Sequence, residues 1–260
     1  MKGAIMDFNK LTADMNSIPG HLGFYYKNLI TGEEYGVRES EQYGAASVIK
    51  LPIFMCIAKW AAEGKADLSE KIKVNRDVMV PICGALTLFT DEPEVSILTL
   101  CRLMISISDN TATNVLIARF GIPAYQEEFK KIGLKDTQLL RRLFDDAASA
   151  KGIENKIVPK EMGMLLEKVY RKEFVNEETS KLIMDTLMLQ QINHKLGGKI
   201  DCLADIAHKT GEDWKLSNDV GIVLAKQPFI ACYAGHDTDV YLWEDFIRRS
   251  SYDLCVENNK

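Results

Sequence analysis

The sequence predicts an α+β protein: a five-stranded antiparallel sheet flanked by terminal helices, with an all-helical lobe inserted between the strands. Strand-like segments occur near the two ends of the chain, two before residue 46 and three after residue 200. The residues between them carry apolar positions at helical spacing, interrupted by Gly and Pro. The N-terminal strands most simply join the C-terminal ones in one sheet, which leaves the helical lobe as an insertion.

The N-terminal part is expected to begin with a weak helix over residues 6–17, which Ile18-Pro19-Gly20 ends. An aromatic-rich strand over 22–29 follows. A turn at Thr31-Gly32-Glu33 leads into a second short strand over 35–37. After a loop, an apolar helix is expected from Ser47 to about residue 64, with Pro52 tolerated in its first turn.

The central part is predicted to be helical, with two irregular stretches. The helices are expected over 98–107, 111–120, 123–132, 159–171 and 177–189. Residues 65–98 are expected to be mostly irregular, and 136–158 to form a long polar surface loop of the kind that tends to be functional or mobile.

The pattern then changes to strands, expected over 206–211, 220–225 and 229–234, with short polar turns at 214–219 and 226–228. The last 20 or so residues indicate an amphipathic closing helix. We therefore expect one domain over 1–260, with an α/β sub-lobe of residues 1–46 plus 200–260 and a mainly helical sub-lobe of 47–199.

Composition bounds the function classes. The chain has 260 residues, 47% of them hydrophobic, so a sizeable core can form. The net charge is -5 and no basic stripe stands out, so no nucleic-acid partner is predicted. No run is long enough to span a membrane, and the N-terminus has no apolar signal region. We expect a cytoplasmic protein as the sequence stands, or a secreted or periplasmic one if a leader was removed.

The six cysteines are scattered without a Cys-x-x-Cys pair, which argues against a structural zinc site or a redox motif. Cys56, Cys101 and Cys232 lie in apolar runs and are expected to be buried free thiols, which suits a reducing compartment. His21, His194 and His236 are widely separated, so no metal site is predicted.

Ser47-x-x-Lys50 at the start of the apolar helix is the first candidate for chemistry. Positions three apart share a helix face, so the Lys50 amine could activate the Ser47 hydroxyl as a nucleophile. Burial would lower the lysine pKa toward that of a usable base. The alternative is that Ser47 caps the helix and Lys50 extends to solvent.

Two further motifs follow, Ser108-Asp109-Asn110 between two helices and Lys209-Thr210-Gly211 on a strand. Alone, the first could be a helix end followed by a turn, and the second the end of an edge strand. Together with Ser47-x-x-Lys50, in this order and spacing, they make the chain resemble the class A β-lactamase family of serine hydrolases, over nearly its whole length.

The resemblance implies roles for individual residues. Ser47 would attack the carbonyl, Lys50 would take or relay its proton, and Ser108 would pass a proton to the leaving nitrogen. Lys209 would hold the Ser108 hydroxyl and, with Thr210, attract a substrate carboxylate, while the Asn110 amide orients Lys50 and the substrate. The backbone N–H groups of Ser47 and Glu212 would form an oxyanion hole, and Gly211 would let the strand approach the ligand. No cofactor is implied, and the partner is a small-molecule β-lactam or a related amide or ester.

The chain departs from the family in the loop before Pro159. Family members carry Glu-x-x-Leu-Asn there, and the glutamate activates the water that hydrolyses the acyl-enzyme. Residues 140–149 lack this motif, and Asp145 or Asp146 falls near its place. The two aspartates could instead pair with Arg141 or Arg142. We also find no counterpart of the family's arginine behind the carboxylate.

Three hypotheses follow. The first is a β-lactamase with an altered deacylating base. The second is a penicillin-binding or esterase-like hydrolase with slow or no β-lactam turnover. The third, a non-catalytic binding module, is disfavoured by the intact Ser47, Lys50, Ser108, Asn110 and Lys209.

Overall fold

The computed structural model describes residues 7–200 and 202–260. Its centre is a five-stranded sheet in the order β2-β1-β9-β8-β7, with every neighbouring pair antiparallel. The strands are β1 (His21–Asn28), β2 (Glu34–Val37), β7 (Asp205–Asp213), β8 (Leu216–Leu224) and β9 (Phe229–His236). The predicted fold class and the joining of N- and C-terminal strands are therefore confirmed.

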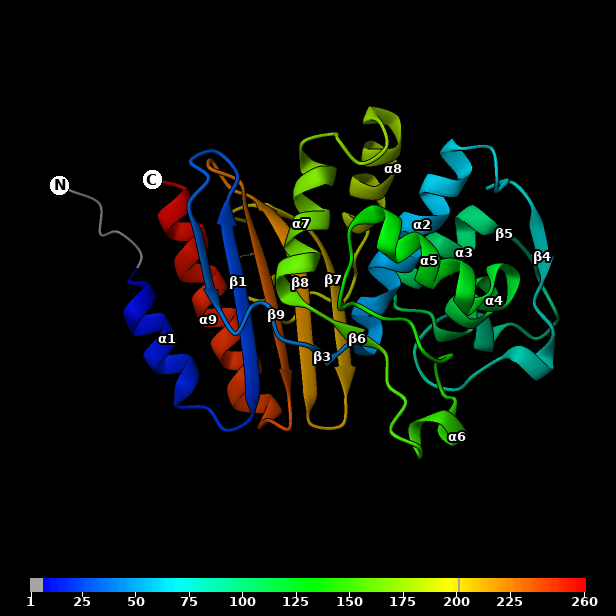
Figure 1. The fold of residues 1–260 in the computed structure, drawn as a ribbon, viewed down its shortest axis with the longest axis horizontal. Helices are drawn as coiled ribbons and strands as arrows, with labels where there is room; N and C mark the ends of the chain where they lie inside the picture. Colours follow the sequence, from blue (N-terminus) through cyan, green and yellow to red (C-terminus); the bar gives the residue numbers. More distant parts are fainter. Residues whose placement is uncertain (1–6, 201) are drawn as a thin grey trace.

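Both faces of the sheet are covered (Figure 1). Helices α1 (Phe8–Asn16) and α9 (Val240–Asn258) lie on one face, and α7 (Pro159–Tyr170) crosses the other. Alternate residues of β1 enter the two cores: Phe24 and Tyr26 pack toward α1 and α9, and Tyr25 packs toward the helical lobe. Tyr25 meets α7 at Gly163, where a Cβ would lie 2.3 Å from the tyrosine ring.

The helical lobe packs beyond α7 and β7, around the nearly fully buried α2 (Lys50–Ala62). Its other helices are α3 (Ile97–Ser106), α4 (Asn110–Phe120), α5 (Ile122–Ile132) and α8 (Glu177–Leu187). All the long helices expected in the described residues are present, with ends within a few residues of the predicted ones. The expected start of the first helix at residue 6 lies outside the described residues. The division into two sub-lobes stays a prediction.

Several short elements were not predicted. The stretch expected to be mostly irregular contains β4 (Lys71–Lys73) paired with β5 (Glu94–Ser96), and the short helices η2 (Arg76–Val78) and η3 (Leu86–Leu88). In the long loop, α6 (Asp146–Ser149) forms one turn, and β6 (Lys156–Ile157) pairs with β3 (Tyr43–Gly44). Two- and three-residue strands carry no periodic signal, since only their partners define them.

Two predictions about local structure were wrong. Ser47 does not open an α-helix: it lies in the short 3₁₀ helix η1 (Ala46–Ile49), and α2 begins only at Lys50. Residues 214–219 are not all turn, because β8 already begins at Leu216. Polar residues occupy that end of β8 because Ser217, Asn218 and Asp219 each make buried hydrogen bonds.

All six cysteines are free, and Cys56, Cys101 and Cys232 are buried as expected. Within the described residues, no helix combines the length and apolar character needed to cross a membrane.

Candidate active site

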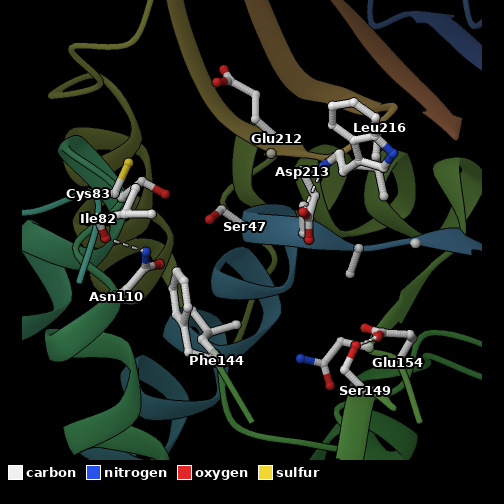
Figure 2. A pocket seen from close by; sticks show the side chains of 18 of the residues that line it. Ser47, Ile82, Cys83, Asn110, Phe144, Ser149, Glu154, Glu212, Asp213 and Leu216 are labelled. Carbon is white, nitrogen blue, oxygen red and sulfur yellow. Dashed lines mark hydrogen bonds between the residues drawn. The ribbon is translucent and has the colours of Figure 1, made fainter. Parts of the chain in front are cut away.

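Ser47 lies on the wall of an open cavity of about 770 Å³, at the junction of the sheet and the helical lobe. Figure 2 shows the Ser47 side chain between Ile82, Cys83 and Asn110 on one side and Asp213 on the other. Its hydroxyl is half-buried and, among the described residues, makes no hydrogen bond. Catalytic hydrogen bonds are often long before substrate binds, so this geometry leaves the hydroxyl available to react.

The strand β7 reaches Ser47 through Gly211. A Cβ on Gly211 would lie 3.0 Å from Ala45 O and Val48 N and 3.1 Å from Ser47 N. A larger residue would push the strand away from Ser47, so the glycine permits the close approach of the two backbones. The expectation that the strand of Lys209-Thr210-Gly211 runs beside the Ser47 segment is confirmed.

The Ser108 hydroxyl lies between two buried amines. Lys50 Nζ is 3.0 Å and Lys209 Nζ 3.1 Å from Ser108 Oγ. Lys50 also donates to Ser108 O at 2.8 Å and to Asn110 Oδ1 at 2.7 Å, and Lys209 donates to Thr210 O at 2.9 Å. Residues from three distant parts of the chain thus form one continuous hydrogen-bonded chain beside Ser47.

Burial changes the basicity of both amines. Both lysines are fully buried, so the alternative of a solvent-extended Lys50 is wrong. Burial and, secondarily, the charge of Lys209 lower the pKa of Lys50 well below its ordinary value. Burial, together with the charge of Lys195, lowers the pKa of Lys209 to about 7. Both pKa shifts favour the neutral amine, which is the form that can accept a proton.

The three residues of the Ser108-Asp109-Asn110 motif do different work. Asp109 is structural: its carboxylate accepts from Ala112 N at 2.8 Å, capping α4, and from Ala85 N and Leu86 N at 2.8 and 3.0 Å. Asn110 donates to Ile82 O at 2.7 Å, which fixes its Oδ1 toward Lys50.

Backbone strain is concentrated around the cavity. Ser108 has φ +58, and four other non-glycine lining residues also have positive φ: Ala46, Ile82, Cys83 and Phe144. Non-glycine residues in this region cost on the order of 1–3 kcal/mol each and gather at functional sites. The strain is consistent with a site whose geometry the surrounding fold imposes.

The long loop forms the wall opposite β7, and its ion pairs differ from those expected. Arg141 pairs with Glu154, Nη2 to Oε2 at 2.6 Å, instead of with Asp145 or Asp146. Asp145 caps the short helix α6 by accepting from Ala148 N at 3.0 Å, whereas Asp146 lines the cavity. Ser149 donates to Glu154 at 2.5 Å, on the same side of the cavity (Figure 2).

Sequence reasoning missed the pair that anchors this loop to the site. The Asn114 side chain accepts from Leu143 N and donates to Leu143 O, both at 2.9 Å, and Leu143 lines the cavity. Asn114 follows Asn110 by one turn of α4, so helical spacing could have drawn attention to it. The loop position that Asn114 holds against the cavity is thus apolar.

Another missed group lies behind β7. His194, Glu212 and Glu244 have ligand atoms within 4.8 Å of one another, the only such metal-competent group found among the described residues. The buried Lys195 ammonium is already 3.0 Å from Glu212 Oε1 and supplies positive charge there. We therefore propose no metal at this group.

The fold is that of the superfamily of β-lactamases and penicillin-binding-protein-like serine hydrolases. The chain belongs to the β-lactamase enzyme family, whose family model matches residues 8–251.

Among curated relatives, the extended-spectrum β-lactamase PER-1 of Pseudomonas aeruginosa is 27% identical over 202 residues, 71% of this chain and 64% of that protein. The match thus spans somewhat less than two thirds of that relative. A solved β-lactamase of Sphaerobacter thermophilus superposes with TM-score 0.87 at 22% identity, covering 97% of this chain and 98% of the other.

PBP-A superposes with TM-score 0.85 at 26% identity, covering 95% of each chain. A PBP-A variant with glutamate in place of a leucine is known as an acyl-enzyme complex with penicillin G, at the same TM-score and identity over 96% of each chain.

Proposed function

We propose that this protein is a serine hydrolase that opens the β-lactam amide bond through an acyl-enzyme on Ser47. The observation that carries the proposal is the chain of Lys50, Ser108 and Lys209 beside an accessible Ser47 hydroxyl. Its substrate is a small molecule, a β-lactam or a related amide or ester.

The chemistry follows from these positions. Ser47 Oγ forms a bond to the carbonyl carbon while its proton passes to Lys50, with the neutral amine favoured by burial. The carbon–nitrogen bond then breaks, and the leaving nitrogen receives a proton from Ser108 Oγ, which recovers one from the neighbouring amine. The backbone N–H groups of Ser47 and Glu212 stabilise the oxyanion, each worth roughly 3–4 kcal/mol.

Binding uses the end of β7. When protonated, Lys209, with the Thr210 hydroxyl, attracts a substrate carboxylate, while Asn110 orients Lys50 and the substrate's side-chain amide. Gly211 lets this end of the strand lie against the Ser47 backbone.

A second candidate is a penicillin-binding or esterase-like hydrolase with slow or no β-lactam turnover. It is favoured by the residues that the long loop before Pro159 places on the cavity wall opposite β7. Leu143, held by Asn114, presents no base, and Asp145 is committed to its helix cap. Of the two aspartates expected as the base, Asp146 lines the cavity and Asp145 does not. Aspartate is short, and a base misplaced by about 1 Å can cost on the order of 100-fold in rate.

The test is mass spectrometry of the protein mixed with a penicillin, followed over time, with Ser47→Ala as the control. An adduct on Ser47 that disappears as product accumulates supports β-lactam hydrolysis, and an adduct that persists supports the second candidate. Labelling that persists in Ser47→Ala would overturn both candidate functions. They would also be overturned if none of the β-lactam and ester probes labelled the wild type.

A further inference from the structure

Lys195 is a fully buried lysine that the proposed chemistry does not use. It lies in the segment between α8 and β7, and its Nζ donates to Gly211 O at 3.3 Å, Glu212 Oε1 at 3.0 Å and Ser217 Oγ at 3.3 Å. A buried ammonium is costly unless it is paired and hydrogen-bonded. All three acceptors lie at the end of β7 or on its partner strand β8.

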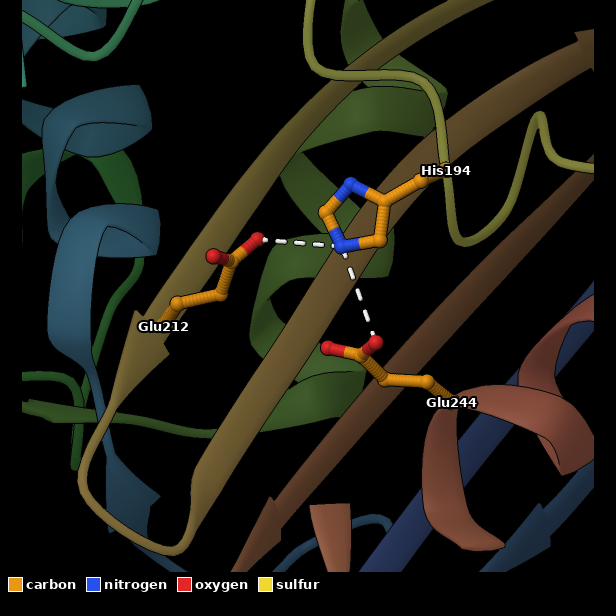
Figure 3. Close-up of side chains that lie close together, drawn as sticks. All are labelled: His194, Glu212 and Glu244. Atoms are coloured by element: carbon orange, nitrogen blue, oxygen red, sulfur yellow. Dashed lines mark ion pairs between the residues drawn. The ribbon is translucent and has the colours of Figure 1, made fainter. Parts of the chain in front are cut away.

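These contacts extend into a cluster that joins β7 to α9. Ser217 Oγ donates to Glu244 Oε1 at 2.9 Å. His194 Nε2 lies between the two carboxylates, 3.4 Å from Glu212 and 3.6 Å from Glu244, as Figure 3 shows. The nearby carboxylate of Glu244 raises the pKa of His194, which favours the charged ring between the two acids. The end of β7 is thus held from the side of the sheet that α9 covers.

One peptide unit, Gly211–Glu212, is held both by the pairing of β7 with β8 and by Lys195. In a trans peptide the carbonyl and the next N–H point in opposite directions. Because Lys195 draws Gly211 O toward itself, the N–H of Glu212 points away from Lys195. Ser47 lies close to this peptide unit, since the Cβ that glycine lacks would approach Ser47 N to 3.1 Å.

We propose that Lys195 is a positioning residue: its bonds to Gly211 O and Glu212 Oε1 aim the Glu212 N–H at the carbonyl oxygen of a substrate bound to Ser47. This inference rests on the proposed acylation of Ser47. The role is distinct from simple charge burial, because the bonded carbonyl belongs to the same peptide unit as the oxyanion donor. Loss of Lys195 should therefore weaken stabilisation of the oxyanion more than it weakens substrate binding.

The test compares Lys195→Met with wild type in reaction with a chromogenic cephalosporin, and Lys199→Met removes an exposed lysine from the same segment as the control. Acylation of Ser47 at saturating substrate should slow on the order of 10–100-fold in Lys195→Met, as expected for a misaimed oxyanion donor. The dissociation constant of the non-covalent complex should change by less than about threefold, because such a donor acts mainly in the transition state. Lys199→Met should match wild type in both quantities.

Infrared difference spectra of the acyl-enzyme measure the frequency of the ester carbonyl band, which should not change if Lys195 only stabilises the fold. The ester carbonyl band should shift to higher frequency in Lys195→Met, because a weaker hydrogen bond leaves the carbonyl less polarised. Only folded molecules form the acyl-enzyme, so the band and the rate constant do not depend on the yield of folded protein. If the methionine variant does not fold, Lys195→Gln, whose side chain is one bond shorter and uncharged, should show the same direction of change.

An unchanged rate constant and an unchanged band in the folded variant would overturn the positioning role, and so would equal losses in binding and acylation. A wild-type protein that cannot be acylated would instead remove the proposed function on which this inference rests.

Discussion

Replacing Lys50 by methionine separates the proposed chemistry from the stability of the fold. Methionine keeps a buried chain of similar length and removes only the amine. The lost contacts are those of Lys50 Nζ with Ser108 O, Ser108 Oγ and Asn110 Oδ1, at 2.8, 3.0 and 2.7 Å.

The effect on rate should be much larger than the effect on stability. A positioned base contributes on the order of 10²–10⁴ in rate. We therefore expect acylation of Ser47 to slow roughly 1,000-fold, which corresponds to about 4 kcal/mol in the barrier. Leaving Ser108 O and Asn110 Oδ1 without this donor costs about 1–3 kcal/mol each. Removing a desolvated amine offsets part of that cost, so the free energy of unfolding should fall by no more than about 2 kcal/mol.

The dependence of the acylation rate on pH tests whether the neutral Lys50 amine is the base. Burial lowers the pKa of Lys50, and the neutral amine is the base, so wild-type acylation should rise with pH through this lowered pKa and level off before an ordinary lysine titrates. The methionine variant should lack this rise. Stopped-flow measurement with a chromogenic β-lactam across the neutral range provides both rates, and urea unfolding provides the stability. A methionine variant that acylates within about tenfold of wild type, with the same rise, would refute the role of Lys50 as the base.

Three further predictions concern capture, stability and turnover. Lys209→Ala should weaken capture of carboxylate-bearing substrates roughly 10–100-fold and neutral esters much less. In wild type the preference for carboxylate-bearing substrates over neutral esters should fall as pH rises past the Lys209 pKa of about 7, because the cation is lost. If Lys209→Ala weakened capture of both kinds of substrate equally, Lys209 would not be the carboxylate-binding group. Asp109→Ala leaves three N–H groups unpaired, two of them buried, and should lower the free energy of unfolding by roughly 3 kcal/mol in urea unfolding. A loss under about 1 kcal/mol would be inconsistent with these contacts. Leu143→Glu should speed loss of the penicillin adduct at least about tenfold by supplying a base on a fixed backbone, whereas the uncharged Leu143→Gln should not.

Much of the fold could be predicted because its signals are local. The 3.6-residue spacing of apolar side chains marks the long helices, and Gly121 and Gly133 mark where two of them end. The alternation of Phe24, Tyr25 and Tyr26 across the sheet follows from the period of a strand. The short pairs β3–β6 and β4–β5 escaped prediction because nothing local to two or three residues specifies a distant partner.

The sequence by itself indicated the family, because three short motifs stand in a fixed order, and those motifs supply the residues that we propose carry the chemistry. Tertiary structure alone decided how Lys50 and Lys209 meet at Ser108, and that Asp109 serves the fold. It also decided that Lys195 is buried behind β7, since a lysine in a polar segment gives no sign of burial. The physical reason is that pKa shifts and hydrogen bonds depend on distance and desolvation, which packing sets between residues far apart in the chain.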